Sequence, residues 1–206
     1  MNVEFVEAER IGMKPLVVHE AGAAAVYWGC VGGWLVAELA YMRRTSADGQ
    51  GRDRSTSLLT LVSLSGMGLA LLAAYELDSV TIQGPGWWPL VAGLAVMAAA
   101  LAFRVWAMRT LGKYFKYAVV IQIEHEVIET GPYRRVRHPS YTGMILAAFG
   151  AGLALGNWFS PVLWGSFVLV GFTIRLRSEE RELSAGLGEP YQAYMERTHR
   201  LIPGVW

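Results

Sequence analysis

Hydrophobic residues form five blocks along the chain, and polar residues are gathered in the segments between them. The blocks cover residues 21–42, 58–75, 87–108, 141–155 and 159–174. A helix needs about 20 residues to cross the hydrocarbon core of a bilayer, and the first three blocks reach that length. We therefore expect each of these three blocks to be a transmembrane helix.

The last two blocks are too short to span a bilayer alone. One interpretation is a pair of buried helices in a soluble core. The interpretation we favour is a tight hairpin that turns at residues 156–158 and continues as polar helix beyond the bilayer, because recurring Gly, Ala and Ser permit close helix contact. The whole pattern then predicts an all-α integral membrane protein with about five transmembrane helices.

Basic residues are concentrated in the segments that follow the first, third and fifth blocks. The two opposite connections, residues 76–86 and 156–158, contain neither Lys nor Arg. The positive-inside rule places the basic segments in the cytoplasm. We therefore expect a multi-pass protein with its amino terminus outside and its polar carboxyl-terminal region in the cytoplasm.

Composition supports the membrane assignment and narrows the possible partners. Of the 206 residues, 53% are hydrophobic and 17% are charged, whereas a soluble domain has about 25% charged residues. The net charge of +1, without basic residues interleaved with aromatic ones, argues against nucleic acid as a partner. Cys30 is the only cysteine and the four histidines lack the close spacing of a zinc motif, so we expect no metal site. Without an internal repeat or a low-complexity linker, residues 1–206 are expected to form one domain.

Residues 131–143, GPYRRVRHPSYTG, carry a dense polar cluster just before the fourth block. Pro139 suits the first turn of a helix and biases His138 away from helical geometry. A helix amino terminus favours anions, and Arg137 strengthens that preference. Arg134 and Arg135 are more simply explained as basic membrane anchors whose side chains snorkel to the interface. His138 and Tyr141 indicate a binding site, because an anchor needs neither imidazole nor phenol.

A second polar cluster follows the fifth block. Arg175 and Glu179 are four residues apart, which places them on one helical face. An exposed ion pair is one interpretation of this spacing. The other is a functional site, since ionisable groups at the edge of the hydrocarbon usually face a polar cavity. By itself, His125 in an extended connector is more typical of a structural residue. Glu38, near the end of the first block, can reach the membrane interface and is interpreted as a plain interfacial residue.

Together these residues resemble the isoprenylcysteine carboxyl methyltransferase family, part of a wider group of membrane methyltransferases that includes phospholipid N-methyltransferases. The resemblance rests on GPYRRVRHPSYTG, on His125 upstream, and on RSEEREL and YQAYMERTHRLIP downstream. It covers roughly residues 104–206, the expected catalytic core, which follows amino-terminal helices in residues 1–103. One departure is Thr198-His199, where the family commonly has Thr or Val followed by Pro.

The resemblance implies a cytoplasmic pocket for S-adenosylmethionine that is closed by the carboxyl-terminal segment. Five residues match the family's cofactor side, and Arg137 is added because its positive charge favours anions. The residues expected on the cofactor side are therefore His125, Tyr133, Arg137, His138, Tyr141 and Glu180. Arg175 and Glu179 match the family's Arg and Glu near the methyl-transfer centre, so we expect them to be catalytic.

The expected function is S-adenosylmethionine-dependent methyl transfer to a lipophilic acceptor at the membrane. We favour carboxyl O-methylation of an isoprenylcysteine-like acid or another lipid acid, because a carboxylate is already nucleophilic and needs no base. The alternatives are N-methylation of a phospholipid or another amine, reduction of a sterol-type substrate with NADPH, and a non-enzymatic transporter or scaffold. The expected partners are membrane lipid and a lipophilic small-molecule or prenylated substrate, with the oligomeric state left open.

Overall fold

The computed structural model describes residues 14–46, 54–83, 86–115 and 127–204. In chain order the helices are α2 (Leu16–His19), α3 (Ala21–Ser46), α4 (Arg54–Glu76), η1 (Asp78–Val80), α5 (Trp88–Leu111), η2 (Gly112–Tyr114), η3 (Gly131–Arg134), α6 (Pro139–Ala154), α7 (Phe159–Leu187) and α8 (Glu189–Arg197). Within the described ranges there is no β-strand, and two isolated β-bridges pair Thr81 with Asn157 and Val136 with His199. The all-α prediction is confirmed.

By length and composition, the described helices α3, α4, α5 and α7 are long and apolar enough to cross a membrane. The predicted turn between the last two blocks is confirmed, since α6 ends at Ala154 and α7 begins at Phe159. Helix α7 then runs unbroken to Leu187, well past its apolar block, as the predicted polar continuation requires. With 16 residues, α6 is shorter than a bilayer crossing needs, so five crossings stay a prediction.

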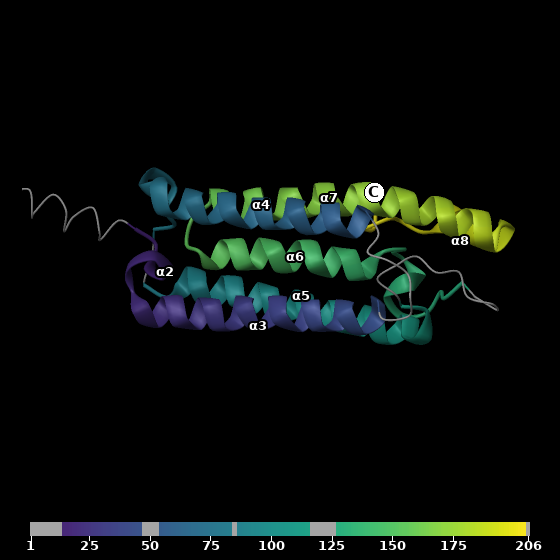
Figure 1. Cartoon of the computed structure of the whole chain (residues 1–206), viewed down its shortest axis with the longest axis horizontal. Coiled ribbons are helices and arrows are strands. Elements are labelled where there is room, and N and C mark those ends of the chain that lie inside the picture. Colours follow the sequence, from purple (N-terminus) through teal and green to yellow (C-terminus); the bar gives the residue numbers. More distant parts are fainter. Residues whose placement is uncertain (1–13, 47–53, 84–85, 116–126, 205–206) are drawn as a thin grey trace, which may run out of the picture.

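Figure 1 shows α6 in the middle of an elongated helical bundle, with α4 and α7 on one side and α3 and α5 on the other. Small residues let the backbones of α5 and α6 approach closely. A Cβ atom on Gly93 of α5 would lie 2.2 Å from the backbone nitrogen of Ala154. One on Gly150 of α6 would lie 2.6 Å from the backbone nitrogen of Met97. The division predicted at residue 104 falls inside α5, so both parts of the chain share this helix.

Replacing Gly93 with alanine is expected to destabilise the protein by about 1–3 kcal/mol, because the added methyl group meets backbone atoms. Gly68→Ala in α4 is the matched control, since nothing lies within 4 Å of its added Cβ and alanine favours a helix over glycine. Thermal unfolding in detergent should give a lower melting temperature for Gly93→Ala only. Equal melting temperatures for the two variants would contradict the tight α5–α6 contact.

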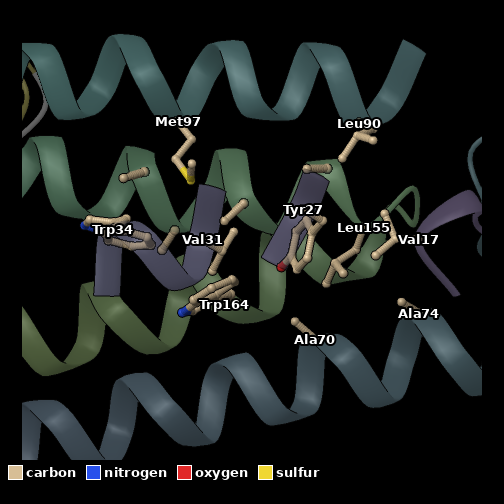
Figure 2. Packing of buried hydrophobic residues seen from close by; sticks show 14 of the residues in the cluster. Val17, Tyr27, Val31, Trp34, Ala70, Ala74, Leu90, Met97, Leu155 and Trp164 are labelled. Atoms are coloured by element: carbon tan, nitrogen blue, oxygen red, sulfur yellow. The ribbon is translucent and has the colours of Figure 1, made fainter. Parts of the chain in front are cut away.

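The hydrophobic core lies toward the end of the bundle that carries α2. Trp34 of α3 packs on Trp164 of α7 with ring centroids 6.2 Å apart, and Tyr27 points into the same cluster (Figure 2). Beyond Trp34, none of the described side chains of α3 is buried, and among the described side chains α4 buries none before Gly66. The helices are therefore closely packed at the α2 end, whereas α3 and α4 leave room at the other end, where α6 begins.

Candidate active site

The start of α6 places three aromatic rings in a stack. His138 precedes the helix with φ −122° and ψ 55°, and Pro139 is the first helical residue, as predicted. The His138 carbonyl accepts a hydrogen bond from the backbone N–H of Tyr141, which fixes the first turn. The His138 and Tyr141 rings stack with centroids 5.3 Å apart, and the Tyr141 ring lies 4.3 Å from that of Phe172 in α7. The first turn of α6 thereby holds Tyr141 against α7.

The Tyr141 hydroxyl joins the two residues that we expected to be catalytic. It donates a hydrogen bond to Glu179 Oε2 and accepts one from Arg175 Nε at 3.0 Å. Arg175 is buried, with 4% of its surface exposed, and Glu179 is partly buried. The four-residue spacing therefore places both groups on one face of α7, as predicted, and this face meets α6.

Glu180 has a different set of partners, because it lies one residue further round α7. Its Oε1 atom accepts a hydrogen bond from Arg137 Nε at 2.9 Å and lies 3.4 Å from His138 Nε2. Its Oε2 atom accepts a hydrogen bond from Arg200 Nε at 3.0 Å. The polar clusters at the start of α6 and near the end of α7 therefore converge, as the family resemblance implied.

The carboxyl-terminal segment, residues 198–201, is held against the start of α6. Arg137 Nη1 donates a hydrogen bond to the Thr198 carbonyl, and the backbone N–H of Arg137 donates one to the His199 carbonyl. In return, the His199 N–H donates to the Arg135 carbonyl at 3.0 Å. A proline at position 199 would lack this N–H, so the departure from the family's pattern adds a hydrogen bond here.

Tyr133, another residue expected on the cofactor side, is held by α8. Its backbone carbonyl accepts a hydrogen bond from the Tyr194 hydroxyl at 2.7 Å. Burial raises the pKa of the Tyr194 phenol above its ordinary value, and it does the same for Tyr133. Tyr194 therefore keeps the proton that it donates, and α8 is tied to η3.

A cavity of about 240 Å³ lies at this end of the bundle. The predicted site residues that line it are Tyr133, Arg137, His138, Tyr141, Arg175 and Glu179. Apolar side chains of α3 and α4 form its other side, among them Leu35, Leu39, Leu59 and Leu64. Glu180 is not among the lining residues, and its carboxylate is engaged behind the cavity wall by the contacts given above. His125 lies outside the described residues.

Two lining residues, Glu38 and Arg104, were not expected at the site. Arg104 of α5 is 3% exposed and forms an ion pair with Glu38 of α3. Its Nη1 atom also donates a hydrogen bond to the Ser140 carbonyl at 3.1 Å. The interpretation of Glu38 as a plain interfacial residue is therefore wrong. A charge inside an otherwise apolar block, as at Arg104, was the available signal, because such charges are costly in a membrane and are usually functional.

Comparison with known proteins ties this arrangement to one family. The sequence model of the isoprenylcysteine carboxyl methyltransferase family matches residues 91–185. Protein-S-isoprenylcysteine O-methyltransferase A of Arabidopsis thaliana is 31% identical over 141 residues, which cover 66% of this chain and 72% of the relative. The chain belongs to the isoprenylcysteine carboxyl methyltransferase family. It is therefore a methyltransferase, as its motifs predicted.

Other members of the family are similar over different lengths. Protein-S-isoprenylcysteine O-methyltransferase B of Arabidopsis thaliana is 27% identical over 75% of this chain and 82% of the relative. The Homo sapiens protein-S-isoprenylcysteine O-methyltransferase is 32% identical over 57% of this chain, and the match spans 42% of the human protein.

A solved structure of a eukaryotic intramembrane Ras methyltransferase, an isoprenylcysteine carboxyl methyltransferase, has the same fold. The TM-score is 0.66, at 19% identity, and the match covers 93% of this chain and 68% of that one. The shared fold and the apolar helices support an integral, multi-pass membrane protein.

Proposed function

We propose that this methyltransferase transfers a methyl group from S-adenosylmethionine to the carboxylate of a lipophilic acid, either an isoprenylated cysteine or a related lipid acid. One observation carries the proposal. The hydrogen-bonded group of Tyr141, Arg175 and Glu179 shares a single cavity with apolar side chains of α3 and α4. A polar reaction centre and an apolar surface for the acceptor therefore lie side by side, as methylation of a lipid acid requires.

Arg175 is assigned the role of holding the acceptor carboxylate. A guanidinium binds a carboxylate with a planar fork of N–H groups, and its position here is set by the Tyr141 hydroxyl. Glu179 holds that hydroxyl from the other side. Because a carboxylate is already a nucleophile, these residues supply alignment rather than a base, and alignment accounts for much of the rate of a displacement reaction.

The remaining lining residues fit an S-adenosylmethionine site. The stacked rings of His138 and Tyr141, with Tyr133 nearby, offer flat surfaces for an adenine ring, and Glu179 offers a carboxylate to a cationic group. When bound, S-adenosylmethionine supplies the methyl group. Arg137 and Glu180 contribute by keeping His138 and the carboxyl-terminal segment in position. His125 is retained as a further cofactor residue on the strength of the family resemblance.

The acceptor's tail is proposed to reach the site from the bilayer, between α3 and α4. Toward the site, neither helix has a buried side chain among the described residues, and both present leucines to the cavity. A prenyl or acyl chain can therefore stay in apolar surroundings while its carboxylate meets Arg175. In the membrane we propose five crossings, with the amino terminus outside and the site at the cytoplasmic face.

Methyl transfer with tritiated S-adenosylmethionine to purified protein in detergent tests this function. A panel of farnesylcysteine acid, a free fatty acid and phosphatidylethanolamine should yield label on an acid, and mild base should release it because a methyl ester is hydrolysed. Calorimetry should show binding of S-adenosylhomocysteine and none of NADPH. Base-stable label on the amine, or binding of NADPH alone, would contradict the proposal.

A further inference from the structure

The Glu38–Arg104 ion pair ties together α3, α5 and α6. Arg104 is buried in α5, and its guanidinium contacts the Glu38 carboxylate on α3 and both the carbonyl and the hydroxyl of Ser140 on α6. Glu38 is partly open, with 23% of its side chain exposed. Charges within apolar helices are expensive unless they pair, and they usually have a function.

The part of α3 beyond Trp34 packs less deeply into the bundle than the part before it. Among its described side chains none is buried, and Leu35, Leu39 and Met42 line the cavity. Further along, the Tyr41 ring lies 5.9 Å from that of Phe115. Leu35 packs against the edge of the hydrophobic core, and the ion pair at Glu38 holds the cavity wall further along α3.

The same arginine also reaches the reaction centre. Ser140, which accepts two hydrogen bonds from Arg104 Nη1, directly precedes Tyr141 in the first turn of α6. Tyr141 in turn contacts both Arg175 and Glu179. The position of the α3 wall and the position of the reaction centre thus depend on one guanidinium.

We propose that Glu38 and Arg104 are a positioning pair that sets the width of the opening between α3 and α4 and thereby selects the acceptor's apolar tail. This inference rests on the proposed function, because it concerns the acceptor side of the same cavity. The pair does not touch the reacting atoms. It holds the wall against which the tail packs, at a fixed distance from the first turn of α6.

Glu38→Ala is expected to raise the KM for the acceptor by roughly tenfold, the usual size of a coupling between contacting residues, with kcat almost unchanged. Discrimination between geranyl, farnesyl and geranylgeranyl cysteine acids should shrink, because a loosened wall fits each tail less selectively. S-adenosylhomocysteine affinity should stay within about twofold, and Glu38→Gln, whose amide oxygen still accepts from Arg104, should recover part of the selectivity. Val36→Ala, on an exposed face of the same helix, is the matched control and should behave as wild type.

A second measurement does not depend on any substrate. In a Cys30→Ser background, Ala40→Cys and Leu61→Cys place spin labels on exposed positions of α3 and α4. Pulsed electron paramagnetic resonance should show a broader distribution of distances between the two labels after Glu38→Ala and an unchanged distribution after Val36→Ala.

An unchanged distribution after Glu38→Ala overturns the inference even if methyl transfer is found. So does a loss of S-adenosylhomocysteine binding with tail discrimination intact, which would mean a general structural role. A broadened distribution without methyl transfer to any acid supports the pair's mechanical role and rejects the proposed function instead.

Discussion

Arg175→Ala is expected to lower kcat for methyl transfer by about 10²–10³-fold, the loss typical of removing one group that holds charge at a reaction centre. Arg175 lines the cavity, and its guanidinium is positioned by a hydrogen bond of 3.0 Å to the Tyr141 hydroxyl. Binding of S-adenosylhomocysteine should change far less, because Arg175 is assigned to the acceptor. The two effects are separated by calorimetry for binding and by tritium transfer for turnover.

Arg177→Ala is the matched control for this experiment. Arg177 is on the same helix but exposed, and it does not line the cavity. Its replacement should leave turnover near the wild-type value. The turnover of Arg175→Lys should lie between those of Arg175→Ala and Arg177→Ala, since lysine keeps the positive charge and loses the planar fork of N–H groups. Wild-type turnover in Arg175→Ala would remove this residue from the reaction centre.

Glu180→Ala is expected to lower the free energy of unfolding by about 3–5 kcal/mol, because it leaves the largely buried side chain of Arg137 without its carboxylate partner. Arg137 and Glu180 have 8% and 7% of their side chains exposed, so water cannot easily replace the lost contact. The carboxyl-terminal segment, which Arg137 and Arg200 connect to Glu180, should also loosen. Thermal unfolding in detergent should show a lower melting temperature, and trypsin should cut faster after Arg197 or Arg200.

The control for Glu180→Ala is Glu182→Ala. Glu182 is exposed, and its carboxylate accepts a hydrogen bond of 3.4 Å from the Ser178 hydroxyl on the same helix. Its removal should leave both the melting temperature and the tryptic rate unchanged. If Glu180→Ala behaved like Glu182→Ala, the assigned role of Glu180 in holding the carboxyl-terminal segment would be wrong.

Several elements of the site followed from local sequence rules. Pro139 at the start of α6 and the non-helical geometry of His138 were both predictable, because proline restricts itself and its predecessor. The shared face of Arg175 and Glu179 followed from the helical repeat alone. The role of Glu180 could not be derived from the helical repeat. Glu180 lies on a neighbouring face of α7, and its partners are residues at the start of α6 and in the carboxyl-terminal segment.

The rough limits of the long helices could be read from the order of residues, because a membrane-spanning helix is a long apolar run and satisfies its own backbone hydrogen bonds. The same holds for the family, whose motifs are short and contiguous. The partners in the ion pairs were determined only by the three-dimensional packing. Glu38 pairs with Arg104, which is 66 residues away in the chain, and Arg137 contacts both Glu180 and the carboxyl-terminal segment. A buried charge reveals in the sequence only that it is costly, and which opposite charge neutralises it depends on how the helices pack.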